Sequence, residues 1–171
     1  HTEELLALIP PEKDVDGLGK SPLVEPATAQ AILWLLAGYN IELKSKNILI
    51  IGQGRLVGAP LTKMLKEQNL IPTTLDENNS ETELRDALDK ADIIISATGS
   101  AKLIKPEMLR DGQVVIDAGT SKDGGEVVGD LDPAVYESKL DIKVTPTTGG
   151  LGPLTISCLF ENLLQLIDKM A

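Results

Sequence analysis

The stretch NILIIGQGRLVG, residues 47–58, decides the fold that we expect for this chain. Asn47–Ile51 is a continuous apolar run rich in β-branched residues, which predicts a strand buried on both faces. Glycines follow at once in the spacing Gly52-x-Gly54-x-x-x-Gly58. A helix with one buried face is predicted next, from the apolar positions Val57, Leu61, Met64 and Leu65.

This strand–turn–helix unit is a candidate site for a dinucleotide. The first glycine makes a tight turn, the second lets the backbone approach a pyrophosphate, and the helix N-terminus offers N–H groups. Gly58 comes one residue later than in the commonest fingerprint, so the loop is a variant. Asp76 stands at the expected end of a second strand, where a carboxylate can accept hydrogen bonds from the adenosine ribose. The alternatives are a turn that binds nothing and an ordinary strand-end aspartate.

Strand and helix signals alternate along the rest of the chain, which predicts an α/β fold with a doubly wound, Rossmann-like parallel sheet and helices on both faces. The further strands are expected at Pro72–Leu75, Asp92–Ala97, Gln113–Asp117 and Ile142–Thr145, with a hairpin over Ser121–Asp130. Helices are expected at Thr2–Ile9, Ala27–Ala37, Ser80–Lys90 and Pro106–Arg110, and after a turn at Gly149–Pro153, where Ile156, Leu159, Phe160 and Leu163 form a stripe.

Composition excludes several classes of protein. A length of 171 residues with 42% hydrophobic and 2% aromatic residues suits one domain with an aliphatic core. The net charge of −10 argues against binding to nucleic acid or to an anionic membrane surface, and no apolar run is long enough for a membrane span. Cys158 is the single cysteine, which fits a cytoplasmic location, and His1 is the single histidine, so we expect no metal site.

Five separated segments resemble one family in their order and spacing. They are Pro11–Leu18 (PEKDVDGL), Gly52–Pro60 (GxGxxVGxP), Val115–Gly119 (VIDxG), Val128–Asp132 (VGDLD) and Gly149–Thr155 (GGLGPLT). The family is that of the bifunctional methylenetetrahydrofolate dehydrogenase/methenyltetrahydrofolate cyclohydrolases. The resemblance covers almost the whole chain from Pro11 onward.

The resemblance implies a two-domain enzyme of one-carbon folate metabolism, of which this chain carries the C-terminal domain. Residues 26–171 would form the NAD(P)-binding Rossmann domain, and residues 1–25 a linker and folate-facing segment at the junction with an N-terminal domain that this chain lacks. That domain carries the family's catalytic Tyr-x-x-x-Lys motif. In Tyr136-Glu137-Ser138-Lys139 the lysine comes one residue early and in the wrong part of the family's order, so we expect a surface helix there. The chain alone is therefore expected to be inactive, and the family suggests a homodimer.

The same resemblance implies two groups of binding residues. Asp16, Gly149 and Gly150 would contact the folate substrate. For Asp14 a self-capping turn explains the residue about as well as folate binding does, so Asp14 is left out of the site. The residues implied for the dinucleotide are Gly52, Gln53 and Gly54 at the phosphates, Arg55 beside them, Asp76 at the adenosine ribose, and Thr98, Gly99 and Thr120 around the nicotinamide and its ribose.

Departures from the family pattern cluster around both ligands. The family usually has Arg-Ser at Gln53-Gly54 and His-Ser at Asp76-Glu77, and its arginine often holds the 2′-phosphate of NADP. Either NAD or NADP fits the domain, and these changes favour NAD. The family's Pro-Cys-Thr-Pro appears here as Pro26-Ala27-Thr28-Ala29, and its Pro-Gly-Gly as Thr148-Gly149-Gly150.

Three functions remain open at this point. The first is an enzyme domain separated from its catalytic partner, and the second is a binding or regulatory module that keeps the fold and does no chemistry. The third is an amino-acid or shikimate-type dehydrogenase with a similar dinucleotide domain. Asp16 and the Gly149–Thr155 segment argue against the third.

Overall fold

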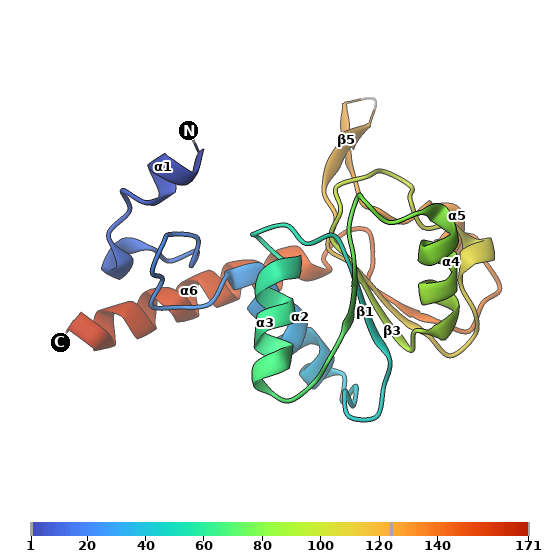
Figure 1. The fold of residues 1–171 in the computed structure, drawn as a ribbon, viewed down its shortest axis with the longest axis horizontal. Helices are drawn as coiled ribbons and strands as arrows, with labels where there is room; N and C mark the ends of the chain where they lie inside the picture. The colour runs from blue at the N-terminus through green and yellow to red at the C-terminus, as the bar shows by residue number, and fades with distance from the viewer. Residues whose placement is uncertain (1, 124, 171) are drawn as a thin grey trace.

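A five-stranded parallel sheet forms the centre of the computed structural model, which describes residues 2–123 and 125–170 (Figure 1). His1, the single histidine, lies outside the described residues. The strand order is β2-β1-β3-β4-β7, so the chain reverses its direction of travel across the sheet after β2. The strands are β1 (Ile48–Ile51), β2 (Thr73–Leu75), β3 (Ile93–Ser96), β4 (Val114–Asp117) and β7 (Lys143–Val144).

Helices cover both faces of this sheet, as the alternation of strand and helix signals predicted. One face carries α2 (Ala27–Gly38), α3 (Gly58–Glu67) and α6 (Leu151–Met170), and the other carries α4 (Glu81–Lys90), α5 (Ala134–Glu137) and the 3₁₀ turn η2 (Pro106–Met108). A hairpin of β5 (Ser121–Asp123) and β6 (Glu126–Val128) projects from the body, and α1 (Thr2–Leu6) and the 3₁₀ turn η1 (Pro11–Lys13) precede α2. The doubly wound α/β prediction is confirmed.

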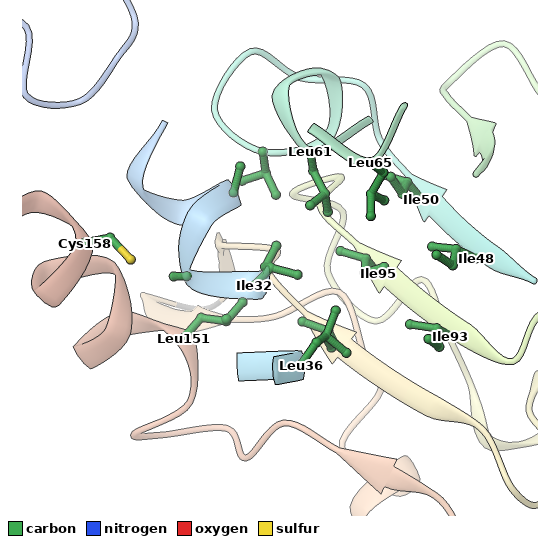
Figure 2. Close-up of a cluster of buried hydrophobic side chains, with 14 of the residues drawn as sticks. Ile32, Leu36, Ile48, Ile50, Leu61, Leu65, Ile93, Ile95, Leu151 and Cys158 are labelled. Atoms are coloured by element: carbon green, nitrogen blue, oxygen red, sulfur yellow. The ribbon is translucent and has the colours of Figure 1, made fainter. Parts of the chain in front are cut away.

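Side chains alternate across the sheet and build two separate aliphatic cores. Ile48 and Ile50 of β1 point to the α2, α3 and α6 face, where they meet Ile32, Leu61 and Leu65 (Figure 2). Leu49 and Ile51 point to the other core, beneath α4 and α5. Strands buried on both faces explain why the sequence shows continuous apolar runs instead of an apolar–polar alternation.

Local sequence explains where α4 begins. The Ser80 hydroxyl accepts the backbone N–H of Glu83, and a Glu83 carboxylate oxygen accepts the backbone N–H of Ser80 at 2.7 Å. This reciprocal capping box satisfies two N–H groups that an isolated helix start leaves unpaired. These bonds lower the pKa of the Glu83 carboxyl.

Several predicted boundaries need correction. The turn expected over Gly149–Pro153 ends at Gly150, because α6 begins at Leu151 and includes Pro153 in its first turn. A proline is tolerated there because the N–H groups of a first helical turn have no intrahelical acceptor. The N-terminal helix is shorter than predicted and ends at Leu6, and the helical turn after Pro106 is a single 3₁₀ turn.

Three of the four residues in the apolar stripe predicted on the last helix face away from the core, whereas the fourth, Leu159, packs against it. Ile156 is 56% exposed and Phe160 is 65% exposed, and Leu163 is also exposed. The buried positions of α6 are instead Leu151, Cys158, Asn162 and Leu166. A second apolar face therefore remains on a helix that already packs one face against α2.

A buried amide holds the N-terminal segment against α6 and α2. The Asn162 side-chain N–H groups donate to the carbonyl oxygens of Val15 and Glu25 at 2.8 and 3.0 Å, and its oxygen accepts from Gln30 at 2.7 Å. Asn162 has no exposed surface, so all three bonds are shielded from water.

Within the described residues, no helix combines the length and apolar character that a membrane crossing requires.

Candidate functional site: a cavity at the carboxyl ends of the strands

A cavity of about 590 Å³ lies where β1, β2 and β3 end. This volume suits a small-molecule or cofactor site. The strand order reverses between β1 and β3, and in open parallel sheets ligands bind outside the carboxyl ends of the strands at such a switch point. Its lining includes the predicted residues Gly52, Gln53, Gly54, Asp76 and Thr98.

The three glycines of the loop have different reasons to be glycine. Gly52 has φ +90°, and a Cβ there would overlap the Ala97 carbonyl. A Cβ at Gly58 would overlap the Gly52 carbonyl, so both glycines are required by the fold itself. A Cβ at Gly54 would meet no heavy atom within 4 Å, and Gly54 does not have positive φ. The protein alone therefore gives no reason for a glycine at position 54, beside an open cavity.

Gln53 is tied to the loop and to α3. Its Oε1 accepts the hydroxyl of Thr62 at 3.2 Å, and its Nε2 donates to the Gly52 carbonyl at 3.2 Å. The side chain therefore braces the turn with a neutral group, at a position where the resemblance implies a cation in most of the family. Among the described residues that line the cavity there is no lysine or arginine.

A hydrogen-bonded turn follows β2 and closes one side of the cavity. Asp76 Oδ1 accepts the backbone and side-chain N–H groups of Asn78 at 2.9 and 3.1 Å. The backbone N–H of Asp76 donates to Asn79 Oδ1 at 2.9 Å. Among the described residues, the other carboxylate oxygen, Oδ2, forms no hydrogen bond within this turn. Glu77 adds another carboxyl to the lining. This edge of the cavity is consequently acidic and rich in acceptors.

A buried carboxylate holds the loop after β3. Asp130 Oδ2 accepts the Ser96 hydroxyl and the Thr98 backbone N–H, both at 2.7 Å. Asp117, at the end of β4, accepts the backbone N–H groups of Asp130 and Leu131 at 3.0 and 3.1 Å. Burial raises the pKa of the Asp117 carboxyl and the charge of Asp130 adds to the rise, whereas the backbone N–H bonds oppose it.

The remaining predicted residues lie outside the cavity lining. Gly99 and Thr120 lie close together, because a Cβ at Gly99 would be 3.5 Å from the Thr120 carbonyl oxygen. Arg55 is exposed in the turn before α3. The structure brings none of Asp16, Gly149 and Gly150 into the cavity: Asp16 is exposed beside the Val15–Asn162 bond, and the two glycines directly precede α6.

Asp14 has the structural role that the sequence suggested. Its two carboxylate oxygens accept the backbone N–H groups of Leu18 and Gly19 at 3.1 and 2.7 Å, and the residue is 3% exposed. The interpretation of Asp14 as a self-capping turn residue is supported.

Sequence reasoning missed several residues of the site. The cavity is also lined by Asn78, Asn79, Leu84, Ser100 and Leu103. A signal for the first two was present, because Asp-x-Asn-Asn directly after a strand is typical of turns closed by side-chain hydrogen bonds. Asp130 lies in the Val128–Asp132 segment that carries the family resemblance, but nothing in that segment indicates its side-chain partners, which are more than thirty positions away.

Comparison with known families and curated proteins gives one consistent result. A family model described as the NAD(P)-binding domain of tetrahydrofolate dehydrogenase/cyclohydrolase matches residues 26–171. The bifunctional protein FolD of Lactobacillus acidophilus is 42% identical over 177 residues, and that of Lactobacillus helveticus is 40% identical. The alignments cover 98% of this chain but only 61% and 62% of the two relatives.

Solved structures of similar proteins have the same fold. A methylenetetrahydrofolate dehydrogenase of the silkworm Bombyx mori superposes with a TM-score of 0.89 at 31% identity, over 99% of this chain and 64% of that one. The Trypanosoma brucei dehydrogenase-cyclohydrolase, solved with NADP and an inhibitor, gives 0.86 at 29% identity, over 99% of this chain and 63% of that one. Shikimate 5-dehydrogenase of Listeria monocytogenes gives 0.50 at 13% identity, over 81% and 58%, which is a likeness of fold alone.

Proposed function

The chain belongs to the tetrahydrofolate dehydrogenase/cyclohydrolase family as its NAD(P)-binding domain, and we propose that it binds NAD in a methylenetetrahydrofolate dehydrogenase/cyclohydrolase whose catalytic lysine lies outside this chain. The domain's own residues bind and orient the cofactor. When bound, the nicotinamide ring supplies the hydride-accepting chemistry.

The open space at Gly54 carries this proposal. A dinucleotide pyrophosphate needs close backbone approach, and position 54 offers it while the fold itself would accept a side chain there. The remaining oxygen of Asp76 suits the hydroxyls of an adenosine ribose. Calorimetric titration of the chain with NAD and with NADP at equal ionic strength tests the proposal, and heat from neither cofactor would overturn it.

The folate would bind on a different side from the adenosine. Asp16 is exposed, and a Cβ at Gly149 would meet no heavy atom within 4 Å, so both are accessible to a ligand. We assign folate contacts to Asp16, Gly149 and Gly150 from the family resemblance. The domain boundary is proposed at residue 26, with residues 1–25 as the folate-facing junction segment.

The outward apolar face of α6 is the surface on which we place the rest of the enzyme. Ile156, Phe160 and Leu163, together with Leu159 and Val15, line an apolar groove. Figure 1 shows that the C-terminal part of α6 runs out of the α/β body beside the N-terminal segment. The relatives contain the additional length that could cover this face, because the chain spans only 61% of one of them.

We expect the chain alone to oxidise methylenetetrahydrofolate at the background rate, because it contains no match to the family's Tyr-x-x-x-Lys motif. A chimera should turn over, if it joins the preceding part of Lactobacillus acidophilus FolD to this chain. Spectrophotometric assay of NADH or NADPH formation compares the two. Turnover by the chain alone would refute the prediction. An inactive but folded and NAD-binding chimera would favour the non-catalytic binding module instead.

A variant on the outward face of α6 tests whether the rest of the enzyme binds there. Phe160→Asp should prevent activity in the chimera and leave dinucleotide binding by the chain unchanged, because Phe160 is largely exposed and does not line the cavity. We also propose a homodimer that uses another surface. Sedimentation velocity should therefore give the same oligomeric state for the Phe160→Asp chain, and loss of a dimer would assign the face to a second copy instead.

A cytoplasmic location is proposed from the single cysteine, Cys158, which is buried.

A further inference from the structure

We propose that Asp130 is a positioning residue that sets the loop from Ala97 to Ser100 for dinucleotide binding, without touching the ligand itself. The ligand named here rests on the proposed function, whereas the control of the loop by Asp130 does not. Asp130 has no exposed surface, so any influence on the cavity must pass through its partners.

Its bonds reach the cavity within two residues. The carboxylate accepts a hydrogen bond from the hydroxyl of Ser96, the last residue of β3. It also accepts one from the backbone N–H of Thr98, which lines the cavity. The Thr98 hydroxyl oxygen in turn accepts the backbone N–H of Ser100 at 3.0 Å, and Ser100 also lines the cavity. A single carboxylate therefore connects the last residue of β3 with the first residues of the loop.

The other oxygen of Asp130 is buried without a partner. Among the described residues, Oδ1 makes no hydrogen bond, although the atom has almost no solvent-accessible surface. A buried polar atom left unpaired costs stability and is rare in folded proteins. An unpaired buried oxygen needs an explanation, and a carboxylate kept for the bonds of its other oxygen to Ser96 and Thr98 supplies one.

A reciprocal contact prevents Asp130 from moving independently of the sheet. The Asp117 carboxylate accepts the backbone N–H of Asp130. It also lies so close to Gly129 that a Cβ there would overlap it. In the same way, a Cβ at Gly119 would overlap the Asp130 carboxylate. Each aspartate therefore packs against the segment that carries the other. The segments Val115–Gly119 and Val128–Asp132, which carried part of the family resemblance, contact each other and connect β4 to the end of the hairpin.

Three variants test the proposal, with Asp132→Ala as the matched control. Asp132 lies in the same loop, but the one donor to its carboxylate among the described residues is the Ala134 N–H at the start of α5. Asp130→Ala should make amide hydrogen exchange at Thr98 at least about tenfold faster and weaken NAD binding at least about tenfold, because the half-buried Thr98 N–H loses its acceptor. Asp130→Asn should restore both values to near those of the wild type, because its amide oxygen can accept the same two bonds. Asp132→Ala should lower the melting temperature alone.

The measurements separate this inference from the proposed function. If the wild-type chain binds neither NAD nor NADP, the proposed function fails, and exchange at Thr98 still decides the control of the loop. Unchanged Thr98 exchange in Asp130→Ala would overturn the inference, and so would faster exchange with unchanged affinity in a chain that binds NAD. If Asp130→Ala does not fold, Asp130→Ser replaces it with the same expected results, because the shorter hydroxyl cannot reach Thr98.

Discussion

Gly54→Val will abolish dinucleotide binding by this chain, with a dissociation constant raised at least about a hundredfold, equivalent to about 2.7 kcal/mol. The substituted side chain would project into the open space that a pyrophosphate needs for backbone approach. The free energy of unfolding should change by less than about 1 kcal/mol, because Gly54 is exposed and does not have positive φ. Calorimetry and denaturant unfolding on the same sample measure both quantities.

Gly58→Ala provides the contrast. A methyl group there would overlap the Gly52 carbonyl, so we expect loss of the native fold before any question of binding arises. Substitution of Gly54 would then affect dinucleotide binding, whereas substitution of Gly58, four residues later, would affect folding. Unchanged affinity in Gly54→Val would show that the loop is only a turn, whatever Gly58→Ala does.

The layered fold could be predicted from the sequence because each element is specified locally. The short β-branched runs at Asn47–Ile51 and Asp92–Ala97, each followed by a glycine turn, favour strands. Ser80 with Glu83 marks a helix start by chemistry within one turn. The last helix is different. Its periodicity correctly indicated a helix, but periodicity does not say which apolar face is covered, so the stripe with Ile156 and Phe160 was predicted without the knowledge that it faces outward.

The residues of the site likewise fall into those that local sequence could predict and those that it could not. Gly52, Gln53, Gly54 and Asp76 follow strands directly and could be placed from their position in the sequence. Asp130 could not, because its role depends on Ser96 and Thr98, which come into contact with it only through the packing of β3 against β4 and the return of the hairpin. The Val128–Asp132 segment could be recognised in the sequence, but the positioning role of its carboxylate could not, because that role depends on contacts distant in the chain.

We expect the cofactor preference to be for NAD over NADP, by up to about thirtyfold, and this expectation depends on the acidic turn after β2. The 2′-phosphate of NADP carries nearly two negative charges at neutral pH. It would lie close to Asp76 and Glu77, which both line the cavity. Two carboxylates at about 4–6 Å would each oppose it by roughly 1 kcal/mol in a partly solvated site, which together correspond to about thirtyfold. The NAD ribose presents hydroxyls instead, which Asp76 can accept.

The double variant Asp76→Ser/Glu77→Ser should remove this preference, because it eliminates both charges. Gln53, which braces the turn through Thr62, supplies no compensating cation in either protein. Arg55 is the residue that could reverse the outcome, because it lies in the adjacent turn and a guanidinium can form a charge-assisted pair with a phosphate. Paired titrations of NAD and NADP at one ionic strength, on the wild type, the double variant and Arg55→Gln, decide between the two effects. Tighter binding of NADP by the wild type, lost in Arg55→Gln, would show that Arg55 holds the 2′-phosphate despite the neighbouring carboxylates.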